Sequence, residues 1–153
     1  MTRRNIALGL VAAAAGAIAF PLVRLASRDR PTPGVSSDAL KDGLELQRDG
    51  RYEDAVQAFT RIIRAQGDVP EAYLFRGISL HNAQRFDDAI RDFTTVLRLV
   101  PDNVTVRLYR GDSYLALGRT DSAAQDFEEV VRAAPEDGRL VVAAKSKLRS
   151  LER

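Results

Sequence analysis

The sequence contains no cysteine and only one histidine, His81. Without cysteine the chain can form neither a disulfide nor a thiolate metal site, and it has no thiol nucleophile. With a single histidine it cannot build a histidine-rich metal site. The lack of cysteine fits the cytosol and an oxidising compartment equally well. These absences exclude several classes of enzyme before any motif is considered.

The sequence also lacks an excess of positive charge in its central part, residues 36–137. The net charge is +2, but residues 1–35 carry +4, residues 36–137 carry −6 and residues 138–153 carry +4. A protein that binds the phosphate backbone gathers its basic side chains on the binding body. Because the central body is acidic here, we expect no nucleic-acid partner.

Residues 1–26 are predicted to be a membrane anchor or an export signal. Residues 6–23 contain no charged side chain, and Arg3 and Arg4 precede them. A helix of this length spans about 27 Å, close to the thickness of the bilayer's hydrocarbon core. We therefore predict a membrane protein with a single-pass N-terminal anchor. The alternative is an exported or periplasmic protein after signal cleavage, because residues 17–19 have the small-x-small form of a cleavage site; a transit peptide and a buried helix also stay open.

A linker, residues 27–35, is predicted to follow this segment. It contains Pro31, Pro33 and Gly34, which interrupt regular structure, and serine and charged side chains that keep it solvated. We expect a short and fairly stiff spacer before the folded domain.

An internal repeat with a constant spacing organises the rest of the chain. Glycine, alanine, phenylalanine and proline each recur in a column at this spacing. The columns are Gly43, Gly77 and Gly111; Ala55, Ala89 and Ala123; Phe59, Phe93 and Phe127; and Pro101 and Pro135. They divide the chain into three units, residues 36–69, 70–103 and 104–137.

Each unit is predicted to be a pair of helices. The first helix ends at Gly50, Gln84 or Gly118, since glycine suits the left-handed conformation that closes a helix. The second helix carries apolar residues at helical spacing. Small side chains are expected where two helices pack closely, which accounts for the glycine and alanine columns. Residues 138–153 are predicted to form an amphipathic capping helix that covers the last apolar face.

The four columns resemble those of the tetratricopeptide repeat over residues 36–137. The resemblance implies an all-α fold, a right-handed α-solenoid of three helix-turn-helix repeats, preceded here by the N-terminal hydrophobic helix. The aromatic residue that usually opens the first helix is kept only at Tyr73. The resemblance also implies that the first helices line a concave groove, which takes a peptide or helix of another protein.

Two arginines depart from the family pattern. Arg76 of the second repeat is followed by Asp92 in the second helix of the same repeat. Arg110 and Asp126 have the same separation in the third repeat, whereas the first repeat lacks both partners. We interpret Arg76–Asp92 and Arg110–Asp126 as ion pairs between the two helices of a repeat. The alternative is that they are separate surface charges.

The residues expected to line the groove come from equivalent positions of the three first helices. They are Leu40, Leu44, Gln47, Leu74, Ile78, His81, Asn82, Leu108 and Asp112. An apolar floor with polar edges suits an amphipathic helix or an extended peptide with apolar anchors. The alternative is that these leucines simply pack between the repeats.

Family members that grip the acidic C-terminal tails of heat-shock chaperones do so with a clamp of lysine, asparagine and arginine. The matching slots here hold Leu40, Leu44, Ile78, Thr105 and Tyr109. None of them matches, so the resemblance implies that a chaperone-tail clamp is not expected.

No catalytic motif is predicted. The stretch "RGDS" at residues 110–113 contains an adhesion tripeptide and a serine-hydrolase-like GDS, but it falls inside a predicted helix, where a nucleophile elbow cannot form. No glycine-rich phosphate loop is present. We expect no nucleophile–base pair, no metal-ligand set, no cofactor and no enzymatic activity.

The sequence therefore predicts a membrane-tethered or exported scaffold that binds another protein in its groove and helps to assemble a complex. The alternative is a structural, self-associating repeat protein without a peptide ligand.

Overall fold

The computed structural model describes residues 37–133 and 138–152. These residues belong to one compact unit, residues 32–153. The predicted anchor or signal and most of the predicted linker precede that unit. Both predicted segments lie entirely outside the described residues. No helix within the described ranges is long and apolar enough to cross a bilayer.

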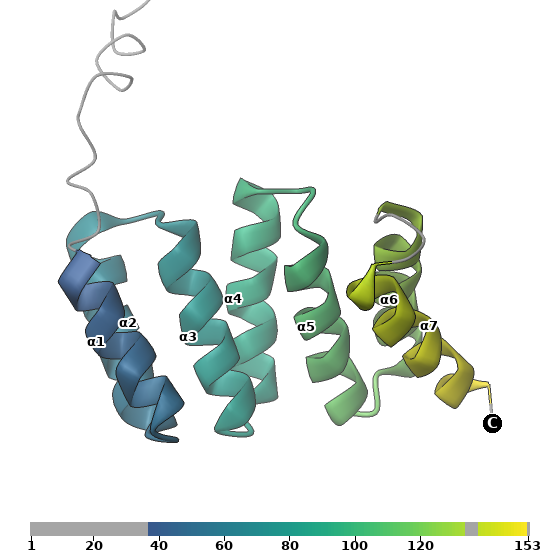
Figure 1. The fold of residues 1–153 in the computed structure, drawn as a ribbon, viewed down its shortest axis with the longest axis horizontal. Coiled ribbons are helices and arrows are strands. Elements are labelled where there is room, and N and C mark those ends of the chain that lie inside the picture. Colours follow the sequence, from purple (N-terminus) through teal and green to yellow (C-terminus); the bar gives the residue numbers. More distant parts are fainter. Residues whose placement is uncertain (1–36, 134–137, 153) are drawn as a thin grey trace, which may run out of the picture. The chain divides into compact units, whose positions relative to one another are not determined.

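The described residues form α-helices joined by short connections (Figure 1). The helices are α1 (Ser37–Arg48), α2 (Tyr52–Gln66), α3 (Pro70–Asn82), α4 (Phe86–Leu99), α5 (Val104–Ala116), α6 (Thr120–Ala133) and α7 (Arg139–Leu151). The first six form three helical hairpins, and each hairpin packs against the next. The prediction of an all-α stack of helical hairpins is thereby confirmed.

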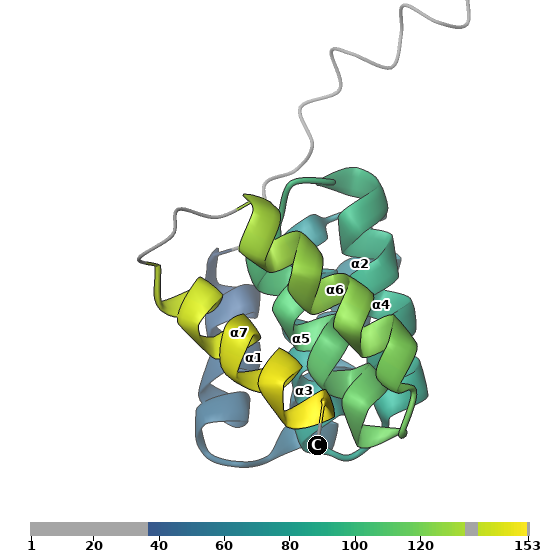
Figure 2. The same cartoon turned by 90° about the vertical axis from the view of Figure 1, so that its right-hand side faces the viewer.

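The helices are arranged in two rows. Seen from the α7 end, α1, α3, α5 and α7 lie on one side and α2, α4 and α6 on the other (Figure 2). We call these the odd row and the even row. Helix α7 packs against α6 and α5, so it continues the odd row, and it is the last helix of the described residues.

Each hairpin turns at a residue with a left-handed backbone. The φ angles are +75° at Gly50, +60° at Gln84 and +70° at Gly118. In each turn, the residue after this position donates a backbone hydrogen bond to the carbonyl five residues back, as in Arg51 N to Leu46 O at 2.9 Å. This is the Schellman arrangement, which satisfies the last carbonyls of the first helix. The equivalent position can hold glutamine in the second repeat because αL is unfavourable, but not forbidden, for a residue with a Cβ.

The glycine column faces the phenylalanine column. Phe59, Phe93 and Phe127 are fully buried, and each ring lies against the glycine of its own repeat. A Cβ atom built on Gly77 would lie 2.7 Å from Phe93 Cε1, well inside van der Waals contact. The glycine is therefore required by the phenylalanine ring of the facing helix, a contact that the sequence did not specify.

Helix α7 covers the C-terminal end of the core. Val141 and Ala144 are buried, and Leu140, Leu148 and Leu151 pack against the cluster around Phe127. Burial of these side chains removes the apolar end of the third hairpin from water.

Candidate functional site on the odd row

All residues predicted to line a groove lie on helices of the odd row. Their apolar members are half-buried and pack against the core. Leu40 and Leu44 join the cluster around Phe59, Leu74 and Ile78 the cluster around Phe93, and Leu108 the cluster around Phe127. These side chains therefore support the stack on one side and reach the surface on the other. Asn82 is exposed, and Gln47 is half-buried.

A hollow of about 350 Å³ opens on this row between α3, α5 and α7, with the first residue of α4 also in its lining. It is lined by His81, Phe86, Asp112, Leu115, Ala116 and Lys147. Two of the predicted groove residues, His81 and Asp112, thus meet at one site, whereas Gln47 and Asn82 do not line it. No group of three or more potential metal ligands occurs among the described residues.

His81 contacts the next repeat through a buried serine. Its Nδ1 lies 2.9 Å from Ser113 Oγ, a serine–histidine contact that the sequence did not predict. The Ser113 hydroxyl donates its one proton to the Tyr109 carbonyl at 3.0 Å. His81 Nδ1 must then be the donor to Oγ, which is the reverse of the polarity that a general base needs. Ser113 is fully buried, so its hydroxyl is not accessible to a substrate, and its contact with His81 joins α3 to α5.

Asp112 is held from the other side by the capping helix. Lys147 Nζ lies 2.6 Å from Asp112 Oδ1, and the same ammonium group stands 5.9 Å from the centre of the Phe127 ring. The sequence did not predict a role for Lys147, because the equivalent residues of the second and third repeats are Ser79 and Ser113, which give no signal of an ion pair. The pair contributes polar groups to the lining of the hollow, whose apolar wall consists of Phe86, Leu115 and Ala116.

The half-buried imidazole of His81 should make stability depend on pH. Burial lowers the pKa of His81; the nearby Asp112 carboxylate opposes this shift, and Lys147 adds to it. The unfolded chain therefore binds a proton more readily. Neutral His81 makes its full contribution to the free energy of unfolding above about pH 6.5, the ordinary histidine pKa. This contribution is lost as the pH falls below that value.

We expect the wild type to lose stability relative to His81→Asn between pH 7 and pH 5, by less than about 1.4 kcal/mol per pH unit. The asparagine amide can still donate to Ser113, so the comparison isolates the titration. Urea unfolding of both proteins across this pH range measures it. A constant difference between the two proteins would contradict the direction of the shift.

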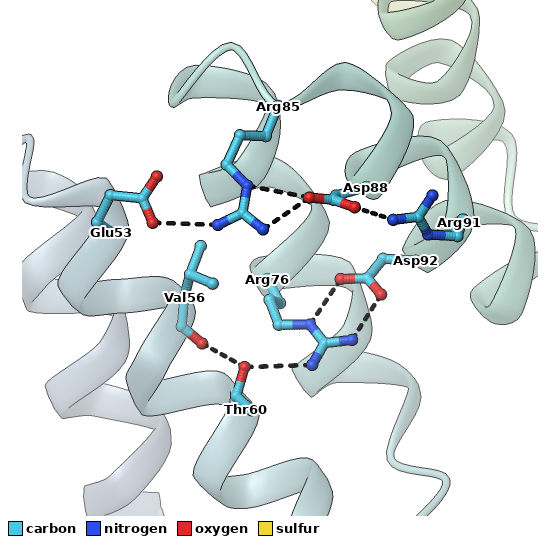
Figure 3. A network of polar contacts seen from close by, with 8 residues as sticks. All are labelled: Glu53, Val56, Thr60, Arg76, Arg85, Asp88, Arg91 and Asp92. Atoms are coloured by element: carbon cyan, nitrogen blue, oxygen red, sulfur yellow. Dashed lines mark hydrogen bonds and ion pairs between the residues drawn. The ribbon is translucent and has the colours of Figure 1, made fainter.

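The predicted ion pair of the second repeat lies between α3 and α4 (Figure 3). Arg76 donates two hydrogen bonds to Asp92, Nε to Oδ2 and Nη2 to Oδ1, both at 2.7 Å. The side chains are 19% and 7% exposed, so the pair is largely buried. Burial raises the pKa of the Asp92 carboxyl and the guanidinium bonds act against that rise, while the bond to Asp92 raises the pKa of Arg76.

Arg76 also reaches the preceding repeat. Its Nη1 donates to Thr60 Oγ1 on α2 at 3.2 Å, and Thr60 in turn donates to the Val56 carbonyl at 2.7 Å. The structure thus extends the predicted pair into a contact among three helices. Thr60 was not predicted from the sequence, although it precedes Arg76 by the same separation as Arg76 precedes Asp92.

The same three-residue arrangement recurs one repeat later. Arg110 donates to Asp126 at 2.8 and 2.7 Å and to Thr94 Oγ1 at 3.1 Å. Thr60 and Thr94 occupy equivalent positions of successive repeats, as do the two arginines and the two aspartates. This equivalence was a signal that could have identified both threonines. In both arrangements the arginine forms an ion pair within its own repeat and donates a hydrogen bond to a threonine of the preceding repeat.

A second, more exposed set of ion pairs lies beside the first (Figure 3). Arg85 binds Glu53 of the preceding repeat at 3.2 Å and Asp88 at 2.6 Å, and Asp88 also pairs with Arg91. The inter-repeat member recurs as Arg119–Asp87 at 2.9 Å. Because these side chains are about half exposed, each pair contributes little to stability, on the order of 0–1 kcal/mol.

Comparison with known proteins agrees with this architecture. The family model of the tetratricopeptide repeat matches residues 40–93 and 82–138. The chain belongs to the tetratricopeptide repeat family. No curated protein matches it.

Several solved structures are similar to the chain. The second tetratricopeptide repeat domain of human RPAP3, in complex with an HSP70 peptide, is 26% identical with a TM-score of 0.68, over 76% of this chain and 94% of that one. The Arabidopsis OM64 domain is 24% identical with a TM-score of 0.69, over 76% and 95%. The Yersinia enterocolitica type III secretion chaperone SycD, in complex with a peptide of the translocator YopD, is 14% identical with a TM-score of 0.71, over 75% and 90%.

Proposed function

We propose that this protein is a non-enzymatic scaffold that binds a peptide or helix of another protein along the odd row and helps to assemble a complex. The observation that carries the proposal is the hollow between α3, α5 and α7, where an apolar wall of Phe86, Leu115 and Ala116 faces a polar edge. Its volume of 350 Å³ is near the lower limit of small-molecule sites, about 300–1,000 Å³. That size suits one or two anchor side chains of a longer ligand.

The relative at 26% identity supports a peptide ligand, since it was solved with an HSP70 peptide. We do not propose an acidic chaperone tail for the present chain. Leu40, Leu44 and Ile78 occupy slots of the tail-binding clamp, and they pack against the core. Lys147, the cation at the hollow, is already paired with Asp112. A ligand with an apolar anchor fits the site better than a polyanionic one.

A bulky side chain at Ala116 tests this proposal. Ala116 is exposed and lines the hollow, so Ala116→Trp should fill the site without entering the core. Peptides selected from a displayed library for binding to the full chain should bind the variant at least about tenfold more weakly, a loss of about 1.4 kcal/mol. Gln125→Trp, on the exposed surface of α6, is the matched control and should bind as the wild type does. Equal binding by Ala116→Trp would exclude the hollow as the site.

We also propose that residues 6–23 hold the protein at a membrane, or direct its export if they are removed. The proposal rests on the uncharged run and its arginine flanks. N-terminal sequencing of the mature protein distinguishes the two cases. A start at Phe20 or beyond would defeat the anchor and leave the exported form.

A further inference from the structure

The first helix of the stack exposes an acidic face. Asp38, Asp42, Glu45 and Asp49 are three or four residues apart, so they share one side of α1 and its C-terminal turn. All four are exposed. Asp38 lies 3.7 Å from Lys41, and Asp49 lies 3.7 Å from Arg48, so the acidic face includes some local pairing.

The equivalent face of the first helix is covered in the second and third repeats. The residues equivalent to Asp38 are Ala72 and Val106, and those equivalent to Glu45 are Ser79 and Ser113. All of these equivalents are fully buried. In the second and third repeats, this side of the first helix packs against the preceding repeat, which the first repeat does not have among the described residues.

The last helix exposes a basic face. Helix α7 contains four basic residues and no acidic one. Val142, Lys145 and Arg149 are exposed at helical spacing, and neither cation has an ion-pair partner in the described part of the chain. Val142 continues the repeat column of Leu40, Leu74 and Leu108 at the same spacing.

Val142 is the exposed member of this column among the described residues. The three leucines of its column are half-buried, whereas Val142 is 62% exposed, the larger of two such exposures among the described large apolar residues. Leu74 and Leu108 pack in clusters that include residues of the next odd-row helix. Among the described residues, Val142 has no odd-row helix after it to pack against.

An internal contact gives the register for an added helix. His81 on α3 touches Ser113 on α5. Arg149 occupies the position of His81 two repeats later, and Glu45 occupies the position of Ser113 two repeats earlier. If the odd row continued from α7 into the α1 of another molecule, Arg149 would therefore face Glu45.

We propose that copies of this chain associate head to tail, with the basic face of α7 on one copy against the acidic face of α1 on the next. The two faces differ, so the contact is heterologous and can extend into chains of molecules. Opposite charges favour this orientation. Like charges oppose the two alternatives, in which α1 meets α1 or α7 meets α7. Because the charges are exposed, the association is weak and sensitive to salt. It leaves the hollow on the odd row free and does not depend on the proposed peptide ligand.

Sedimentation velocity of the full chain in a non-ionic detergent tests this contact. We expect mass to increase with protein concentration at about 0.05 M NaCl and to fall back toward the monomer at about 0.5 M, where the Debye length is less than half as long. Glu45→Arg and Arg149→Glu should each weaken association at least roughly tenfold, because each places like charges opposite one another.

The double variant Glu45→Arg with Arg149→Glu should recover most of the wild-type association, since the pair is restored with its charges exchanged. Glu45→Arg with Arg98→Glu has the same net charge, and Arg98 is exposed on α4, so this control should stay as weak as Glu45→Arg alone. A wild type that is monomeric at both salt concentrations would overturn the proposal. That is the result expected if residues 1–36 covered α1, or if the charges served only solubility. Association that all four variants leave unchanged, or a double variant no better than its control, would also overturn it.

Discussion

Gly77→Ala is expected to destabilise the protein by about 2 kcal/mol, although alanine normally stabilises the interior of a helix by about 0.5–1 kcal/mol relative to glycine. The new Cβ would lie 2.7 Å from Phe93 Cε1 and 3.0 Å from Cδ1. Phe93 is fully buried, so its ring cannot swing into solvent and the two helices must move apart. Urea unfolding followed by circular dichroism measures the change.

A smaller partner should relieve this clash. Phe93→Leu alone leaves a cavity, but Gly77→Ala should be less harmful in its presence, giving a coupling of the order of 1 kcal/mol in a double-mutant cycle. Stabilisation by Gly77→Ala, or additivity of the two changes, would mean that the ring does not require the glycine.

Arg76→Met is expected to have a larger effect, about 3–5 kcal/mol, because it leaves the Asp92 carboxylate buried without its cation. The guanidinium makes two hydrogen bonds to that carboxylate and one to Thr60. Thr60 keeps its bond to the Val56 carbonyl, so most of the loss should come from Asp92. The free energy of unfolding again provides the measurement.

Two control variants distinguish the cost of leaving a buried charge without its partner from the cost of losing a contact. Arg76→Met with Asp92→Leu removes both charges and should recover at least half of the loss. Arg51→Met breaks an exposed pair with Asp54 that is equally short, 2.7 Å, and should change stability by less than about 1 kcal/mol. A result for Arg76→Met no larger than that for Arg51→Met would show that burial of the pair does not matter.

The sequence predicted the features that recur because each repeat places equivalent residues in equivalent surroundings. The helix pairs, their left-handed turns at Gly50, Gln84 and Gly118, and the partners of Arg76 and Arg110 all follow from the constant spacing of the columns. The same spacing also applies to the contacts of Thr60 and Thr94. Because each of these contacts joins two repeats, a comparison of residues within one repeat does not reveal it.

Other features could not be obtained from the repeat. Periodicity identifies which helix face Leu40 or Leu74 lies on, but not how deeply it is buried, since depth depends on how closely the next hairpin packs. The Lys147–Asp112 pair and the His81–Ser113 contact depend on the reach of single side chains between helices. Each occurs once, so no column indicates it.

The chain builds a stack of helical hairpins, in each of which a glycine of one helix accommodates a buried phenylalanine ring of the other. Nuclear Overhauser effects from the α-protons of Gly43, Gly77 and Gly111 test this arrangement directly. The structure predicts strong effects to the ring protons of Phe59, Phe93 and Phe127 respectively. The absence of these effects in a folded sample, or effects to other aromatic rings instead, would contradict the account.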